Sequence, residues 1–220
     1  MPSEVDISNM ALYRVGSSIR ITSLNEQIEK TEPVRQAGFW YPIVRDQVLA
    51  TAPWGFARKS VALASVTDTT FPGWSYVYEY PSDCIQAVAI CDAGGLRGPA
   101  FWWDSWNSRN NAISSVEKIP FQIGTRADGN SNVIMTDIPS AYLFYIFRQT
   151  VTATFTPLFV DAFAWKFGSE LGSTVNANAA RVTRCLQMYQ PTLDRAMAQM
   201  MNESQQDKER DSPSIQARAW

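Results

Sequence analysis

The sequence predicts an α+β fold in which helices near both ends of the chain flank a region of strands. Apolar residues follow helical spacing up to Pro53 and again after Phe155, whereas between them the apolar period is close to two and turn residues are frequent. Because an amphipathic helix cannot bury its apolar stripe alone, the helices of the two ends are expected to pack together. The predicted parts are a helical bundle of residues 1–60 and 151–205, an inserted antiparallel β domain of residues 61–150, and an extended C-terminal arm of residues 206–220.

The first two helices are predicted from their end signals. Ser3 can cap a helix of about three turns, and Gly16 is placed to end it. The second helix is expected to start at Thr31-Glu32-Pro33, because a proline in the first turn needs no backbone donor. Pro53 ends it.

Two more helices are predicted after the strands. Thr156-Pro157 provides a cap and a first-turn proline for the third, and Gly172 closes it. The fourth is expected to start near Thr174 and to reach Glu203. Prolines inside the second and fourth helices, Pro42 and Pro191, predict bends because neither can donate a backbone hydrogen bond.

The middle region is predicted to hold six strands. Between two of them, Ala127-Asp128-Gly129-Asn130 indicates a hairpin, because Asp-Gly and Asn tolerate positive φ. The stretch from Asp92 to Asn111 is rich in Gly, Ser and Asn and predicts a long exposed loop. The predicted strands are 60–65, 75–80, 84–91, 118–123, 132–135 and 141–149.

Composition and charge exclude several classes of protein. With 220 residues, 45% of them hydrophobic, the chain can bury a sizeable core as one or two globular domains. Without a run of 18 apolar residues or a signal-peptide pattern at its start, it is expected neither to span a membrane nor to be secreted by that route. A net charge of −2 without a Lys/Arg cluster argues against tight binding of nucleic acid.

Chemical motifs are scarce. The chain has no histidine, which rules out Ser-His-Asp and Cys-His arrangements and His-bound metals, and it has no phosphate-binding glycine motif. Its three cysteines are widely spaced and are interpreted as small buried hydrophobes. We therefore expect no enzyme activity, cofactor or metal. The scattered acids Asp92, Asp104 and Glu117 are the remaining catalytic candidates, and such acids are usually solvated.

Four segments carry a resemblance to a known family. They are Pro53-Trp54-Gly55-Phe56-Ala57, the stretch from Tyr78 to Cys84, the stretch from Tyr189 to Ala196, and Ile215-Gln216-Ala217-Arg218. In order and spacing the chain resembles the tail tubular protein A family of short-tailed, T7-like bacteriophages. The resemblance implies a helical bundle, an inserted β domain and a C-terminal extension. It further implies a virion protein of the tail, assembled in the host cytoplasm, whose homo-oligomeric, dodecameric ring joins the portal to the tail nozzle and lets DNA pass without specific binding.

Two sets of residues are predicted to make the contacts of such an adaptor. Trp102, Trp103 and Trp106 lie in an insertion that departs from the family pattern, and they are expected either to contact the nozzle or a tail fibre or to cover the sheet. In the C-terminal arm, Ile215, Arg218 and Trp220 are expected to dock on the portal, with an inert terminus as the alternative.

Other interpretations stay open beside the adaptor. The aromatic loop and the scattered acids also fit a glycan-binding or glycan-hydrolysing tail component, and an unrelated soluble α+β enzyme is a third alternative. Trp54 and Phe56 are interpreted as a core plug where a helix meets a strand. Arg58 and Lys59 either face a lumen, offset the end of the preceding helix, or are solvated.

Overall fold

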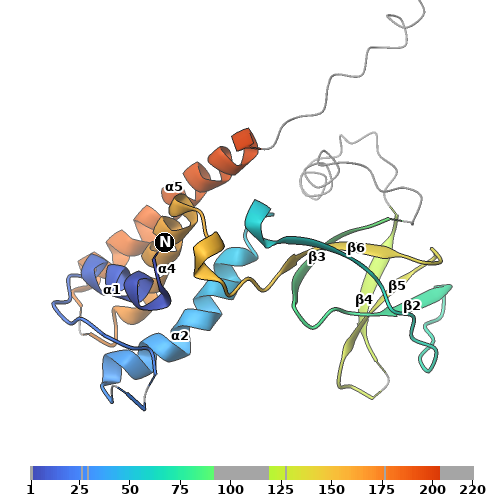
Figure 1. Cartoon of the computed structure of the whole chain (residues 1–220), viewed down its shortest axis with the longest axis horizontal. Coiled ribbons are helices and arrows are strands. Elements are labelled where there is room, and N and C mark those ends of the chain that lie inside the picture. Colours follow the sequence, from blue (N-terminus) through green and yellow to red (C-terminus); the bar gives the residue numbers. More distant parts are fainter. Residues whose placement is uncertain are drawn as a thin grey trace, which may run out of the picture.

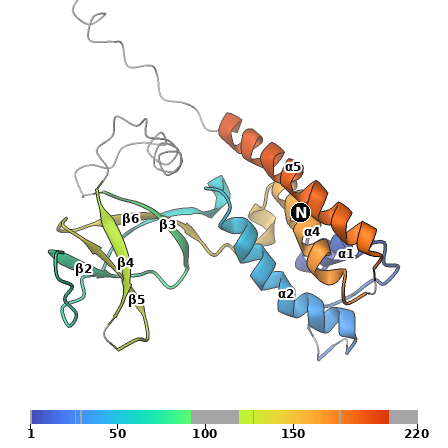
Figure 2. The ribbon, with the colours of Figure 1, turned by 180° about the vertical axis from the view of Figure 1, so that it is seen from behind.

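The computed structural model describes residues 2–25, 27–28, 30–91, 119–126, 128–175 and 177–203. These residues hold four α-helices and two three-stranded antiparallel sheets, which confirms the α+β class. Figures 1 and 2 show the helices gathered at one end of the molecule and the strands at the other. The helices are α1 (Glu4–Arg14), α2 (Glu32–Leu49), α4 (Pro157–Leu171) and α5 (Ala179–Glu203).

Local capping explains where α1 and α4 begin. The Ser3 hydroxyl accepts a hydrogen bond from the Asp6 backbone, and the Asp6 carboxylate accepts one from the Ser3 backbone, which forms a complete capping box. At α4 the Thr156 hydroxyl accepts from the Phe159 backbone at 3.4 Å, and Pro157 occupies the first turn. Both starts agree with the sequence prediction.

The predicted start of α5 near Thr174 was wrong. The helix begins at Ala179, because the Asn178 side chain accepts a hydrogen bond from the Ala180 backbone at 2.9 Å and so caps it there. Before it, the backbone turns back on the end of α4, with a hydrogen bond from the Ala177 backbone to the Gly172 carbonyl. The internal prolines Pro42 and Pro191 lie within continuous helices.

The strands form two separate antiparallel sheets. One has the order β1-β6-β3 and the other the order β2-β5-β4. The first is built from strands far apart in sequence, with Lys59 of β1 opposite Tyr145 of β6. The strands are β1 (Arg58–Ala62), β2 (Tyr76–Glu79), β3 (Cys84–Cys91), β4 (Phe121–Thr125), β5 (Asn132–Thr136) and β6 (Tyr142–Phe147).

The predicted hairpin joins β4 and β5. The last pair of the ladder is Thr125 opposite Asn132, and the Arg126 backbone donates to the Ser131 carbonyl at 2.8 Å beyond it. Gly129 has a φ of 73°, a left-handed conformation that glycine adopts without steric cost. The Asp-Gly signal in the sequence therefore identified this turn correctly.

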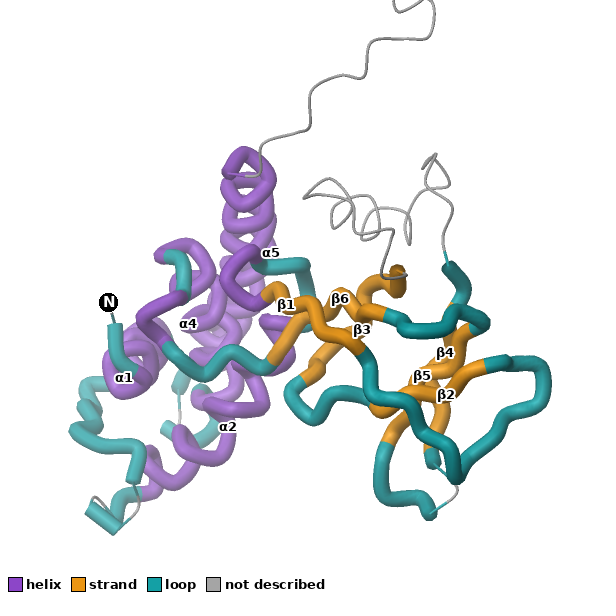
Figure 3. The backbone as a smooth tube through the Cα atoms, turned by 45° about the vertical axis from the view of Figure 1, so that its right-hand side comes forward, coloured by secondary structure: helices purple, strands orange, loops and turns teal. Residues whose placement is uncertain are grey.

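The main core surrounds α4, which contacts α1, α2 and α5. Its aromatic residues Phe159, Phe163 and Phe167 are completely buried and succeed each other along one face of the helix. A second core lies among the strands and includes Ile134 and Leu143. Figure 3 shows the strands beside the helices. Strand β1 follows α2 and strand β6 precedes α4 in the chain, so these two strands connect the first sheet to the helices.

The segment from Pro53 to Ala57 forms the junction between α2 and β1. The Trp54 side chain is 1% exposed, its indole N–H donates to the Val48 carbonyl at 2.9 Å, and its ring contacts Phe159 edge to face at 5.0 Å. The partly buried ring of Phe56 packs against the same core. The core interpretation of these two aromatic residues is therefore confirmed.

All three cysteines, Cys84, Cys91 and Cys185, are buried and free, in line with their interpretation as small hydrophobes. Within the part of the chain that the structure describes, no helix is both long and apolar enough to cross a membrane.

Candidate functional site

The residues predicted as interface sites lie outside the described residues. This holds for Trp102, Trp103 and Trp106 and for Ile215, Arg218 and Trp220. It holds equally for the carboxylates considered for glycan hydrolysis, Asp92, Asp104 and Glu117, and for the expected loop from Asp92 to Asn111. The predictions for these residues therefore remain predictions.

Arg58 and Lys59 contact atoms of their own chain. Arg58 donates from Nε to the Pro53 carbonyl at 2.8 Å, and burial lowers the pKa of its guanidinium. Lys59 Nζ forms an ion pair with Asp83 at 2.7 Å and lies 5.9 Å from the centre of the Tyr145 ring. Lys59 is therefore tied to the sheet, although its side chain is 47% exposed.

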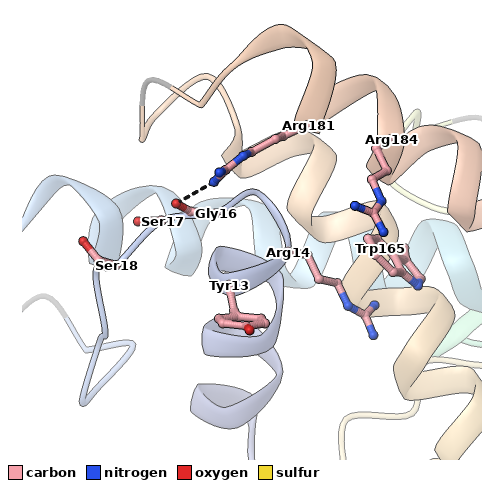
Figure 4. Close-up of a pocket in the computed structure, with 8 residues that line it drawn as sticks. All are labelled: Tyr13, Arg14, Gly16, Ser17, Ser18, Trp165, Arg181 and Arg184. Carbon is pink, nitrogen blue, oxygen red and sulfur yellow. Dashed lines mark hydrogen bonds between the residues drawn. The ribbon is translucent and has the colours of Figure 1, made fainter.

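The most distinctive surface feature is a hollow of about 700 Å³ on the helical part, which we call the arginine groove. It forms where the end of α1 and the turn after it meet α4 and the first turns of α5 (Figure 4). Its lining combines cationic, aromatic and hydroxyl side chains: Tyr13, Arg14, Gly16, Ser17, Ser18, Trp165, Arg181 and Arg184.

Arg14 is held in place on the wall of the groove. Its guanidinium donates to the Asp161 backbone carbonyl at 2.6 Å and forms an ion pair with the Asp161 carboxylate. The same guanidinium lies over the Trp165 ring, 4.1 Å from its centre. These contacts leave the Arg14 side chain only 13% exposed, so its charge is paired and its position is fixed.

Arg181 is anchored to the turn that ends α1. Its Nη1 donates to the Gly16 carbonyl at 2.9 Å (Figure 4) and to the Val15 carbonyl at 3.5 Å. Gly16 has a φ of 73°, and a Cβ atom there would collide with the Arg181 guanidinium. The left-handed backbone favours glycine at this position, whereas the guanidinium is the end of a flexible side chain that could move away from a Cβ atom.

Arg184 lies one turn further along α5, and its side chain extends from that helix toward Trp165 in the view of Figure 4. It makes no hydrogen bond or ion pair with any residue that the structure describes. At the opposite side of the groove, the Tyr13 side chain is 81% exposed. The groove therefore presents an accessible cation at one side and an accessible aromatic ring at the other.

The charges on the groove do not cancel. Of its three guanidiniums, only that of Arg14 forms an ion pair with a carboxylate of the described residues. The Arg181 guanidinium is bonded to neutral backbone carbonyls, and that of Arg184 has no such partner. The groove thus carries two uncompensated positive charges among the described residues, on Arg181 and Arg184. Its chemistry is that of an anion-binding surface with aromatic borders.

The other titratable cluster, on the sheet, is a structural network. The Tyr145 hydroxyl donates to Asp83 at 2.9 Å, and burial together with Asp83 raises the pKa of Tyr145 to about 12. Next to it, burial raises the pKa of the Cys84 thiol to about 11, which keeps this thiol protonated and weakly nucleophilic at neutral pH. Among the described residues, no cluster of three or more acidic or thiol side chains is arranged to hold a metal ion.

Sequence reasoning missed the arginine groove. Its residues come from three segments of the chain. Arg181 and Arg184 lie on the polar side of α5, whereas the sequence prediction for this helix used only its apolar residues. A usable signal was the pair of arginines three residues apart near the start of a helix, but nothing in the sequence places Tyr13 or Trp165 beside them. No protein-family model matches the chain, and no curated protein matches it.

Proposed function

We propose that this chain is a structural protein of a short-tailed bacteriophage, a subunit of the head-to-tail adaptor ring between the portal and the tail nozzle. In this role it catalyses nothing and forms part of the channel through which DNA leaves the head. Its partners are the portal and nozzle subunits, a tail fibre and further copies of the chain. Its place is the tail of the virion, after assembly in the host cytoplasm.

The observation that carries the proposal is the structural role of the segment on which the resemblance depends. Pro53-Trp54-Gly55-Phe56-Ala57 joins the helices to the first sheet, with the Trp54 ring buried against Phe159 of α4. A motif in such a place is tied to the arrangement of the whole chain, because its aromatic rings must fit both the helix before it and the helix after the strands. The segment that carries the resemblance therefore has a structural role in this chain, at the junction of the helices and the first sheet.

The surface of the helices also suits a protein that works through contacts. Several large apolar side chains are exposed there, among them Tyr13 on α1, Phe39 on α2 and Leu186 on α5. On α2, Phe39 packs edge to face against Trp40, with 5.2 Å between the ring centres. Aromatic side chains such as these contribute strongly to protein interfaces, because they bury a large area with few rotatable bonds.

The test is reconstitution with the cognate portal. The purified chain is mixed with preformed portal rings and imaged by electron microscopy, while sedimentation at micromolar concentration reports the mass of the chain alone. We expect a monomer alone and a closed ring on the portal, because a shared platform adds avidity to weak lateral contacts. Portals that stay undecorated, or a stable closed ring without the portal, contradict this assembly route.

Two variants make the reconstitution more specific. A chain ending at Gln205 lacks the arm with Ile215, Arg218 and Trp220 and is expected to stay folded without decorating portals. Replacing Trp102, Trp103 and Trp106 together by Ala is expected to leave portal decoration intact and to weaken attachment of the nozzle or fibre. A reducing-sugar assay on the intact chain addresses the glycan alternative, and release of sugar would overturn the proposal.

A further inference from the structure

The arginine groove has the residue types of a protein-binding hot spot. Arginine, tryptophan and tyrosine are the side chains most enriched among residues that dominate binding energy, and the groove brings all three together. The side chains of Arg184 and Tyr13 are accessible to solvent, and the Arg14 guanidinium stacks on the Trp165 ring at the wall of the groove. The surface therefore offers a charge contact and an apolar contact within one hollow.

Much of the groove is preorganised. Arg14 is fixed by Asp161 and by the Trp165 ring, and Arg181 is fixed by the Gly16 carbonyl. A ligand that binds there need order only Arg184 and Tyr13, so little side-chain entropy is lost on binding. A guanidinium presents two parallel donors, which suit the paired oxygen atoms of a carboxylate or a phosphate group.

The amount of charge on the groove argues against a ligand that carries many negative charges. Nucleic-acid binding commonly engages about six to ten phosphates through clustered basic residues, whereas only Arg181 and Arg184 are uncompensated here. Two cations match one or two carboxylates. The aromatic side chains Tyr13 and Trp165 supply contact area for the apolar part of the same segment.

We infer that the arginine groove is a docking site for a carboxylate-bearing segment of a partner protein, in which one or two Asp or Glu side chains bind Arg184 and Arg181 and a neighbouring apolar side chain packs against Tyr13. The inference does not depend on the adaptor proposal, since its test uses the isolated chain. A failed portal reconstitution and a failed peptide assay are therefore separate results.

The assay measures binding of a short fluorescein-labelled peptide with two adjacent glutamates and one leucine to the full chain, by fluorescence anisotropy at low ionic strength. Arg184→Ala is expected to weaken binding by about two- to fivefold, the effect of one exposed charge contact. Tyr13→Ala is expected to weaken it as well. The matched control is Arg195→Ala, which removes another exposed arginine of α5 outside the groove and should leave the affinity unchanged.

Competing ligands distinguish the classes of anion. The same peptide with glutamine in place of glutamate should bind at least about fivefold more weakly, because it lacks the charge that pairs with arginine. A single-stranded oligothymidylate and inorganic phosphate are the competitors. Absence of peptide binding, equal loss in Arg184→Ala and Arg195→Ala, or stronger binding of either phosphate ligand than of the glutamate peptide would overturn the inference.

Discussion

Removal of one oxygen atom from the core of the helices is expected to stabilise the protein. Tyr41 of α2 is 3% exposed, and its ring packs against Phe163 and Phe167 of α4, with 5.1 and 5.8 Å between ring centres. Its hydroxyl has no hydrogen-bond partner among the residues that the structure describes. The substitution Tyr41→Phe keeps the ring and these contacts and removes only the buried hydroxyl.

The expected gain follows from the balance of two terms. A buried polar group without a hydrogen bond costs about 1–3 kcal/mol, and loss of the oxygen forfeits a few dispersion contacts of about 0.1–0.2 kcal/mol each. We therefore expect Tyr41→Phe to raise the free energy of unfolding by about 1 kcal/mol. For a chain of this length, that corresponds to a rise in Tm of about 2–4 °C.

Urea unfolding followed by circular dichroism measures the change, and Tyr145→Phe is the matched control. The Tyr145 hydroxyl donates to the Asp83 carboxylate at 2.9 Å, so its removal should lower the free energy of unfolding by about 1.5–3 kcal/mol, the range for a hydrogen bond to a charged group. Opposite signs for the two substitutions are the expected result. A loss of more than about 1 kcal/mol in Tyr41→Phe would instead mean that the hydroxyl is hydrogen-bonded in the folded protein, contrary to this prediction.

The pH dependence gives an independent measurement. Burial raises the pKa of Tyr41 above its usual value, because the phenolate is poorly solvated in the core. A group whose pKa is raised by folding contributes stability that is complete below its unfolded pKa, about 10 for tyrosine. That contribution is lost as the pH rises toward the folded pKa. The advantage of Tyr41→Phe over the native chain should therefore increase above about pH 10.

Three further predictions concern caps, acid stability and thiol reactivity. Ser3→Ala removes the capping box of α1 and should lower the free energy of unfolding by about 1 kcal/mol in urea titrations; an unchanged midpoint would contradict it. Burial alone would raise the pKa of Asp83, but hydrogen bonds from Lys59 and Tyr145 outweigh burial and lower this pKa in the folded protein. The Asp83 carboxylate therefore contributes stability above its usual pKa, and this contribution is lost as the pH falls through the lowered pKa of the folded state. Asp83→Asn should therefore flatten the loss of stability below about pH 4, and an acid limb as steep as that of the native chain would count against this. All three thiols are buried, and burial raises the pKa of Cys84 to about 11, so alkylation followed by mass spectrometry should be slow until urea unfolds the protein; rapid native-state labelling of Cys84 would show that it is accessible.

Local structure could be predicted from the amino-acid sequence. Ser3 and Thr156 begin helices because their hydroxyl oxygens satisfy backbone donors within three residues, and Gly129 turns a hairpin because it adopts positive φ. Helix capping and turn formation depend on residues within a few positions of each other, so a short stretch of sequence is enough to predict them. The start of α5 was misplaced by the same kind of reasoning, because the capping capacity of Asn178 was overlooked beside the earlier turn signals.

Contacts between residues far apart in sequence could be seen only in the folded chain. The pairing of β6 with both β1 and β3 joins residues tens of positions apart, and strand periodicity shows which face is buried without naming the neighbouring strand. The arginine groove depends in the same way on how α1, α4 and α5 pack, since no single element contains its cations and its aromatic borders. Side-chain packing between elements is set by the shape and volume of the whole core, and a local pattern in the sequence does not contain that information.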